Sequence, residues 1–276
     1  MHQYLSWHII GNSLSNASPG IDRSLPAMQC TLHLAEKKFD IFNNNYLFYY
    51  AGTYGYKTDN GLLLQNDNAQ LEVNTLADCI TVYVTQGAGN KLFLFTNILF
   101  KIGFMELLRH KGYYYIHGAS VFNPETNRGW LFVGESGAGK TTITKALVNN
   151  GYKFAGDDSL LLYKQQNTII TSGFPEHGKP SIYPQSYQHN IKPAALIFPA
   201  ITRDSQTQIL PVSKQEALLS LLPASILIFI DNKQAEPHLE FLKDLTEQCS
   251  TYKLFMGADI KDNPDKLRNL LEKTLL

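Results

Sequence analysis

The most informative stretch of the sequence, residues 134–141, reads Gly134-Glu135-Ser136-Gly137-Ala138-Gly139-Lys140-Thr141. It satisfies the pattern G-x-x-x-x-G-K-[ST], and it lies between an apolar run at 129–133 and a segment of helical periodicity at 141–150. Glycines let successive backbone amides face a phosphate, and the following helix adds its positive N-terminal dipole there. We therefore expect a phosphate-binding loop; the alternative is a glycine-rich turn that binds nothing.

This loop predicts a nucleoside triphosphate, ATP or GTP, together with Mg²⁺. Lys140 is expected to reach the β- and γ-phosphates. Thr141 is expected to ligate Mg²⁺ through its hydroxyl, a hard oxygen ligand for a hard cation. Thr142, at the start of the helix, is assigned with residues 134–141 to the nucleotide-binding set.

Two acidic groups compete as the magnesium partner of the loop. Asp157 and Asp158 follow the short strand predicted at 152–155, whereas Asp231 ends the apolar run 226–230 in the manner of a Walker B strand. Paired carboxylates beside a phosphate loop are costly unless a cation neutralises them, which favours the first pair. The structural alternatives are a solvated turn for the pair and a polar strand end for Asp231.

Short connections predict antiparallel strands around the loop. The runs 113–122 and 129–133 are joined by a six-residue turn, 123–128, and a parallel pair would need a crossover of about a dozen residues or more. A second hairpin is expected at 160–163 and 168–171. The sequence thus predicts an α/β domain whose phosphate loop follows a strand in a mixed sheet.

The rest of the chain is less informative. Residues 1–95 are rich in short alternating runs broken by Gly and Asn, which predicts a β-rich region of unknown role. Helical periodicity begins at Thr96 and stops at Gly112, and we expect the loop-bearing domain to span 96–276.

Charge and cysteine content exclude several classes. Lys plus Arg and Asp plus Glu both number 24, so no overall field attracts nucleic acid or an anionic membrane. The N-terminus lacks the pattern of a signal peptide, and no stretch reaches membrane-spanning length. Cys30, Cys79 and Cys249 are far apart and predict free thiols without zinc. We expect a cytoplasmic protein.

Three segments resemble the catalytic domain of HPr kinase/phosphorylase and its stand-alone relatives: the run His117-Gly118-Ala119-Ser120, the hairpin into residues 134–141, and the run 150–158. Their order and spacing agree with that family closely over residues 113–163. The resemblance implies a serine-kinase site on a fold akin to phosphoenolpyruvate carboxykinase. In such a site His117, the loop and the aspartate pair act together.

The sequence departs from that family in two places. The Glu-x-Arg-Gly-x-Gly segment of the bifunctional enzymes is absent, and residues 173–180 stand in its place, where Glu176 is a candidate for a further metal ligand. Residues 1–110 do not resemble the N-terminal domain of those enzymes. HPr as substrate and a hexameric assembly are therefore without support, and a homo-oligomer stays open.

These observations predict a kinase that transfers phosphoryl to a serine or other hydroxyl of a peptide, protein or small molecule. We assign magnesium to Thr141 and Asp157, and the base role to Asp158 with His117 nearby; the split between the two aspartates stays open. His117 could instead be a hairpin histidine bound to a carbonyl. The rival functions are an ATPase or GTPase switch that uses Asp231, and a nucleotide-binding module without catalysis.

Overall fold

The computed structural model describes residues 5–9, 28–35, 40, 46–50, 52–85, 92–173, 191–225, 232–260 and 264–275. The chain divides into two compact units. The first consists chiefly of residues up to Gly112, and the second chiefly of residues 113–227 and 235–276.

The first unit is a seven-stranded sheet with the order β1-β2-β7-β6-β5-β4-β3, in which β2 and β7 are parallel and the other described pairs are antiparallel. Its alternation is clearest on β6, where Ala69, Leu71 and Val73 are buried and the residues between them are not. The elements are β1 Leu5–Ile9, β2 Met28–Ala35, β3 Phe48–Tyr50, β4 Thr53–Thr58, β5 Gly61–Gln65, β6 Ala69–Asn74, β7 Cys79–Thr85 and α1 Leu92–His110.

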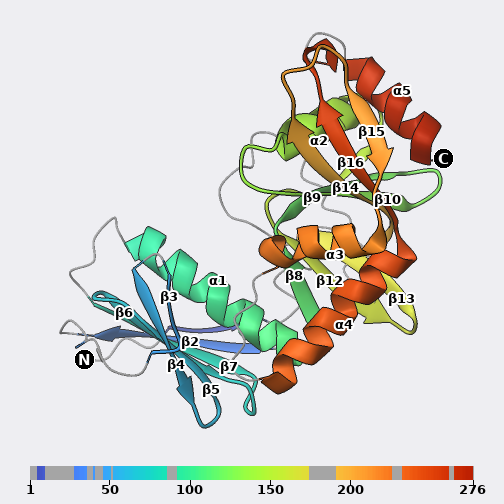
Figure 1. Ribbon diagram of the computed structural model, residues 1–276. Helices are drawn as coiled ribbons and strands as arrows, with labels where there is room; N and C mark the ends of the chain where they lie inside the picture. The colour runs from blue at the N-terminus through green and yellow to red at the C-terminus, as the bar shows by residue number, and fades with distance from the viewer. Residues whose placement is uncertain are drawn as a thin grey trace. The chain divides into compact units, whose positions relative to one another are not determined.

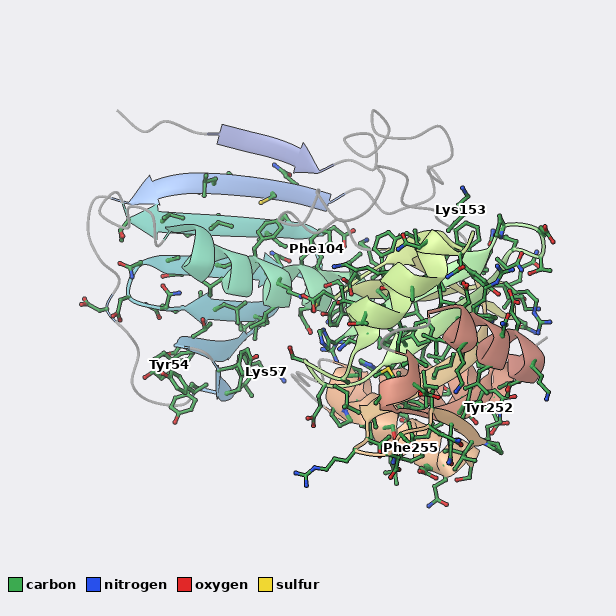
Figure 2. All side chains as sticks on the ribbon, turned by 90° about the horizontal axis from the view of Figure 1, so that it is seen from above. Tyr54, Lys57, Phe104, Lys153, Tyr252 and Phe255 are labelled. Atoms are coloured by element: carbon green, nitrogen blue, oxygen red, sulfur yellow. The ribbon has the colours of Figure 1, made fainter. Side chains whose placement is uncertain are left out.

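Helix α1 lies across one face of this sheet (Figure 1). A Cβ built at Gly103 would lie 2.5 Å from Cδ2 of Leu71, so the helix backbone packs closely on β6. Phe100 and Phe104, one turn apart, stack with ring centroids 5.9 Å apart; Figure 2 labels Phe104. The first unit therefore extends through this helix to Gly112, whereas the boundary predicted from the sequence lies between residues 95 and 96.

The second unit contains a six-stranded mixed sheet of order β11-β9-β10-β14-β16-β15 and a three-stranded antiparallel sheet of order β13-β12-β8. Strand β10 pairs antiparallel with β9 and parallel with β14. The elements are β8 Tyr113–Ile116, β9 Gly118–Asn123, β10 Arg128–Val133, α2 Lys140–Asn149, β11 Lys153–Gly156, β12 Leu160–Gln165, β13 Thr168–Gly173, β14 Lys192–Ile201, β15 Gln208–Pro211, α3 Lys214–Leu221, the 3-10 turn η3 Leu222–Ala224, α4 Asn232–Gln248, β16 Ser250–Met256, the 3-10 turn η4 Ala258–Ile260 and α5 Pro264–Leu275.

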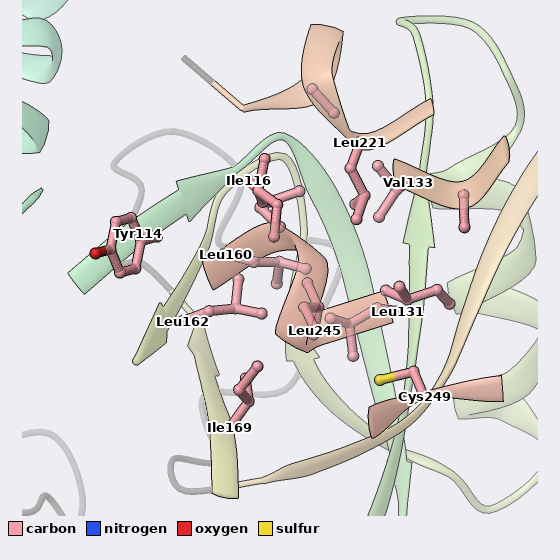
Figure 3. Packing of buried hydrophobic residues seen from close by; sticks show 14 of the residues in the cluster. Tyr114, Ile116, Leu131, Val133, Leu160, Leu162, Ile169, Leu221, Leu245 and Cys249 are labelled. Atoms are coloured by element: carbon pink, nitrogen blue, oxygen red, sulfur yellow. The ribbon is translucent and has the colours of Figure 1, made fainter. Parts of the chain in front are cut away.

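Apolar side chains cover both faces of the six-stranded sheet, as the alternation along β10 shows. Trp130 and Phe132 pack in a cluster with residues of α2 and α5. Leu131 and Val133 pack on the other face with residues of β8, β12, α3 and α4 (Figure 3). A strand buried on both faces explains the continuous apolar run before the loop.

The structure confirms both predicted hairpins and the mixed α/β architecture, and it corrects one strand. The run 113–122 is not a single strand, because it divides at His117 into β8 and β9, which belong to different sheets. At the break, the backbone amide of His117 donates to the carbonyl of Ala224, 2.7 Å away. Asp231 and its apolar run, together with Glu176, lie outside the described residues.

The three cysteines are free thiols, as the sequence predicts. Within the part of the chain that the structure describes, no helix is long and apolar enough to cross a membrane.

Candidate functional site

The loop of residues 134–141 leaves the end of β10 and enters α2, which begins at Lys140. Gly137 and Gly139 have φ values of 84° and 92°, a left-handed conformation that glycine adopts without steric cost. A Cβ at Gly139 would also lie 2.4 Å from Cε of Met256. The curl of the loop therefore depends on glycine at these two positions.

Lys140 folds back over this loop. Its Nζ atom donates to the carbonyls of Gly134, at 2.7 Å, and Glu135, at 2.9 Å, and it lies 3.2 Å from Nε2 of His117. Burial lowers the pKa of Lys140 below its ordinary value of 10.5, and the carboxylates of Asp158 and Asp157 partly oppose that shift. The ammonium group is thus held by two loop carbonyls and lies within electrostatic reach of both aspartates.

His117 and the two aspartates lie close together because each belongs to a connection between the two sheets, and these two connections are neighbours. His117 joins β8 to β9, and residues 157–159 join β11 to β12. Strand β8 pairs with β12 through Ile116 and Leu160, and β9 pairs with β11, whose register shifts just before Asp157. Antiparallel pairing on both sides brings the two connections together, although 41 residues separate His117 from Asp158.

His117 links Asp158 to Lys140 through its two ring nitrogens. Nδ1 lies 2.8 Å from the backbone carbonyl of Asp158 and 3.3 Å from its Oδ1 atom, and Nε2 faces the ammonium of Lys140. A carbonyl only accepts, so Nδ1 carries the donated hydrogen and Nε2 offers its lone pair to Lys140. The alternative role foreseen for this residue, a histidine bound to a carbonyl, is therefore part of the observed geometry.

Thr141 and Asp157 form the second pair of the site. The hydroxyl of Thr141 donates to the carboxylate of Asp157, with Oγ1 lying 3.1 Å from Oδ2 and 3.3 Å from Oδ1. Hydroxyl and carboxylate oxygens suit Mg²⁺, which keeps several water or phosphate ligands besides one or two protein groups. Among the described residues, no cluster of three or more His, Cys, Asp or Glu side chains could hold a metal without such help.

Asp158 differs from Asp157 in its backbone. It has a φ of 69°, and about half of its side chain, 47%, is exposed. Its backbone carbonyl also accepts a hydrogen bond from the hydroxyl of Tyr115, at 3.1 Å. No pattern in the sequence indicates this contact, because Tyr115 stands in a run of three tyrosines that is typical of an ordinary strand.

The remaining residues of the predicted nucleotide-binding set lie in the loop and in the first turn of α2. Glu135, Ser136 and Thr142 are exposed, and Ala138 is half-buried. The structure brings together Lys140, Thr141, His117 and the aspartate pair, and it says nothing of Glu176 or Asp231.

No protein-family model and no curated protein matches the sequence. Among solved structures, the chain is similar to the Hpr(Ser) kinase/phosphatase from Coxiella burnetii, with a TM-score of 0.33 and 12% sequence identity, over 58% of this chain and 95% of that chain. A similarity of this extent is a distant one of fold, and it carries no argument about the reaction.

Proposed function

We propose that this protein is an ATP- and magnesium-dependent kinase that transfers a phosphoryl group to a serine or other hydroxyl of a peptide, protein or small molecule. The observation that carries the proposal is the convergence of one lysine, one histidine and two aspartates on a glycine-rich loop that opens a helix. Phosphoryl transfer requires mainly positioning and charge neutralisation, together with a carboxylate near the attacking hydroxyl.

The loop residues would bind the triphosphate. Backbone amides of residues 134–141 and the N-terminus of α2 offer donors and positive dipole to the phosphates. Lys140 would exchange the carbonyls of Gly134 and Glu135 for phosphate oxygens, since an ammonium binds an anion more strongly than a neutral carbonyl. Thr141 and Asp157 would hold Mg²⁺, which supplies charge neutralisation between the phosphates when bound.

Asp158 would act on the acceptor. Its exposed carboxylate can reach an incoming hydroxyl, whose oxygen forms the new bond to phosphorus while the bond to the leaving diphosphate breaks and the proton passes to the carboxylate. His117 keeps the carboxylate beside Lys140, because one ring nitrogen contacts each group. In this proposal Lys140, Thr141 and Asp157 hold the triphosphate, whereas Asp158 contacts the acceptor.

The proposal is tested by incubating the purified full chain with Mg²⁺ and ATP labelled at the γ-phosphate, in the presence of serine-containing peptides and the products of neighbouring genes. We expect label in an acceptor, and loss of that transfer in Lys140→Ala. Lys145→Ala is the matched control, since Lys145 lies exposed on the same helix. Release of free phosphate without labelled acceptor would favour a nucleotide switch, and binding without turnover would favour a sensing module.

A kinase without efficient phosphorylase activity fits the sequence, which lacks the Glu-x-Arg-Gly-x-Gly segment of the bifunctional enzymes. Inorganic phosphate added to the phosphorylated product should therefore give little pyrophosphate. Rapid pyrophosphate formation by the wild type would reject this part of the proposal.

A further inference from the structure

We propose that Tyr115 is a positioning residue of the phosphoryl-transfer site, because its hydroxyl holds the backbone of Asp158 in the conformation that presents the carboxylate. The inference rests on the proposed function and adds to it a residue that contacts neither nucleotide nor acceptor.

Asp158 stands apart among the described non-glycine residues with positive φ. Asp78, Asn127 and Gln166 have φ values of 52° to 56°, and each lies in the turn of a hairpin, where such a conformation is common. Asp158, at 69°, lies instead in the connection between two sheets, beside the loop. A left-handed conformation costs an L-residue free energy, and it persists only where neighbouring groups enforce it.

Two donors from one strand end enforce it here. Tyr115 lies near the end of β8 and His117 follows that strand, and both side chains reach the same carbonyl. The carbonyl of Asp158 accepts from Nδ1 of His117 at 2.8 Å and from the hydroxyl of Tyr115 at 3.1 Å. A carbonyl oxygen has two lone pairs, and both are used.

The two donors are not equivalent. Nδ1 of His117 is shared with the Asp158 carboxylate, and its ring also faces Lys140, whose partners would change on phosphate binding. Tyr115 is 6% exposed, and its hydroxyl contacts the Asp158 carbonyl and, at 3.3 Å, the hydroxyl of buried Ser159. The buried Tyr115 hydroxyl is therefore the donor that keeps its hydrogen bond to the Asp158 carbonyl during a reaction.

Removing the hydroxyl should release the Asp158 backbone and move its carboxylate away from the acceptor. We expect Tyr115→Phe to lower kcat roughly 2- to 10-fold, the range that loss of one such hydrogen bond gives, with the KM for ATP nearly unchanged. The control is Tyr163→Phe, which removes the hydroxyl of a tyrosine of similar overall burial on the neighbouring strand β12 and should leave kcat unchanged. An equal loss in both variants would overturn the inference.

The Asp158→Asn background separates positioning from general stability. If Tyr115 acts through the carboxylate, Tyr115→Phe lowers kcat no further in that background, and fully multiplicative losses would contradict the inference. A crystal structure of Tyr115→Phe tests it without turnover. We expect φ of residue 158 to leave the left-handed region, and an unchanged φ would overturn the inference even if the wild type proves to be a kinase. Absence of transfer in the wild type would instead remove the proposed function.

Discussion

Alanine substitutions at Gly137 and Gly139 form a matched pair of tests of the loop. Both glycines have a left-handed backbone, but only at Gly139 would an added Cβ meet a neighbouring side chain. A Cβ at Gly137 would meet nothing within 4 Å. Gly137→Ala should therefore lower the free energy of unfolding only by the cost of the left-handed backbone for an L-residue, about 1–2 kcal/mol. Alanine at Gly139 adds a contact 2.4 Å from Cε of Met256, the end of a flexible side chain that can shift, so the added cost is about 1 kcal/mol, the low end of the range for overpacking. The total for Gly139→Ala is thus about 2–3 kcal/mol.

Urea denaturation of both variants measures these free energies of unfolding, and calorimetry with an ATP analogue measures the consequence for binding. We expect Gly139→Ala to lose more stability than Gly137→Ala. Combining Gly139→Ala with Met256→Ala should remove the cost of this close contact, a coupling of about 1 kcal/mol. Equal costs for the two glycines, or no coupling to Met256, would refute the packing that we describe beneath the loop.

Three further outcomes follow from the site and its support. Because burial lowers the pKa of Lys140, its cation is lost at a lower pH than usual, so nucleotide affinity should begin to fall below pH 10.5, and Lys140→Arg should remove that dependence in titration calorimetry. Tyr152→Phe deletes the partly buried hydrogen bond to Glu272, 3.0 Å long, and should lower the free energy of unfolding in urea by about 1 kcal/mol with kcat unchanged. Excess chelator should abolish phosphoryl transfer, and Asp157→Ala should raise the magnesium concentration needed for half-maximal transfer; activity that survives the chelator would contradict the magnesium assignment.

Much of the loop's surroundings was predictable from local patterns. The short turn before residue 128 gave the antiparallel partner of β10, and helical spacing after Gly139 gave α2. Both depend on contacts close in sequence, where turn length and periodicity act directly.

The strand break at His117 and the hydrogen bonds to the Asp158 carbonyl were not predictable. Residues 113–122 look like one strand, and only pairing with β12 on one side and β11 on the other shows that the chain changes sheets there. A hydrogen bond from Tyr115 to a carbonyl 43 residues away leaves no pattern in the sequence. Backbone φ values such as that of Asp158 likewise arise from tertiary contacts, because aspartate itself permits several conformations.

The transfer rate of Asp158→Asn, measured beside its affinity for an ATP analogue, tests the central claim most directly. The variant keeps the size of the side chain and removes the proton acceptor, so transfer to the hydroxyl substrate should fall roughly 10²- to 10⁴-fold while nucleotide affinity changes little. A transfer rate close to that of the wild type would contradict the account.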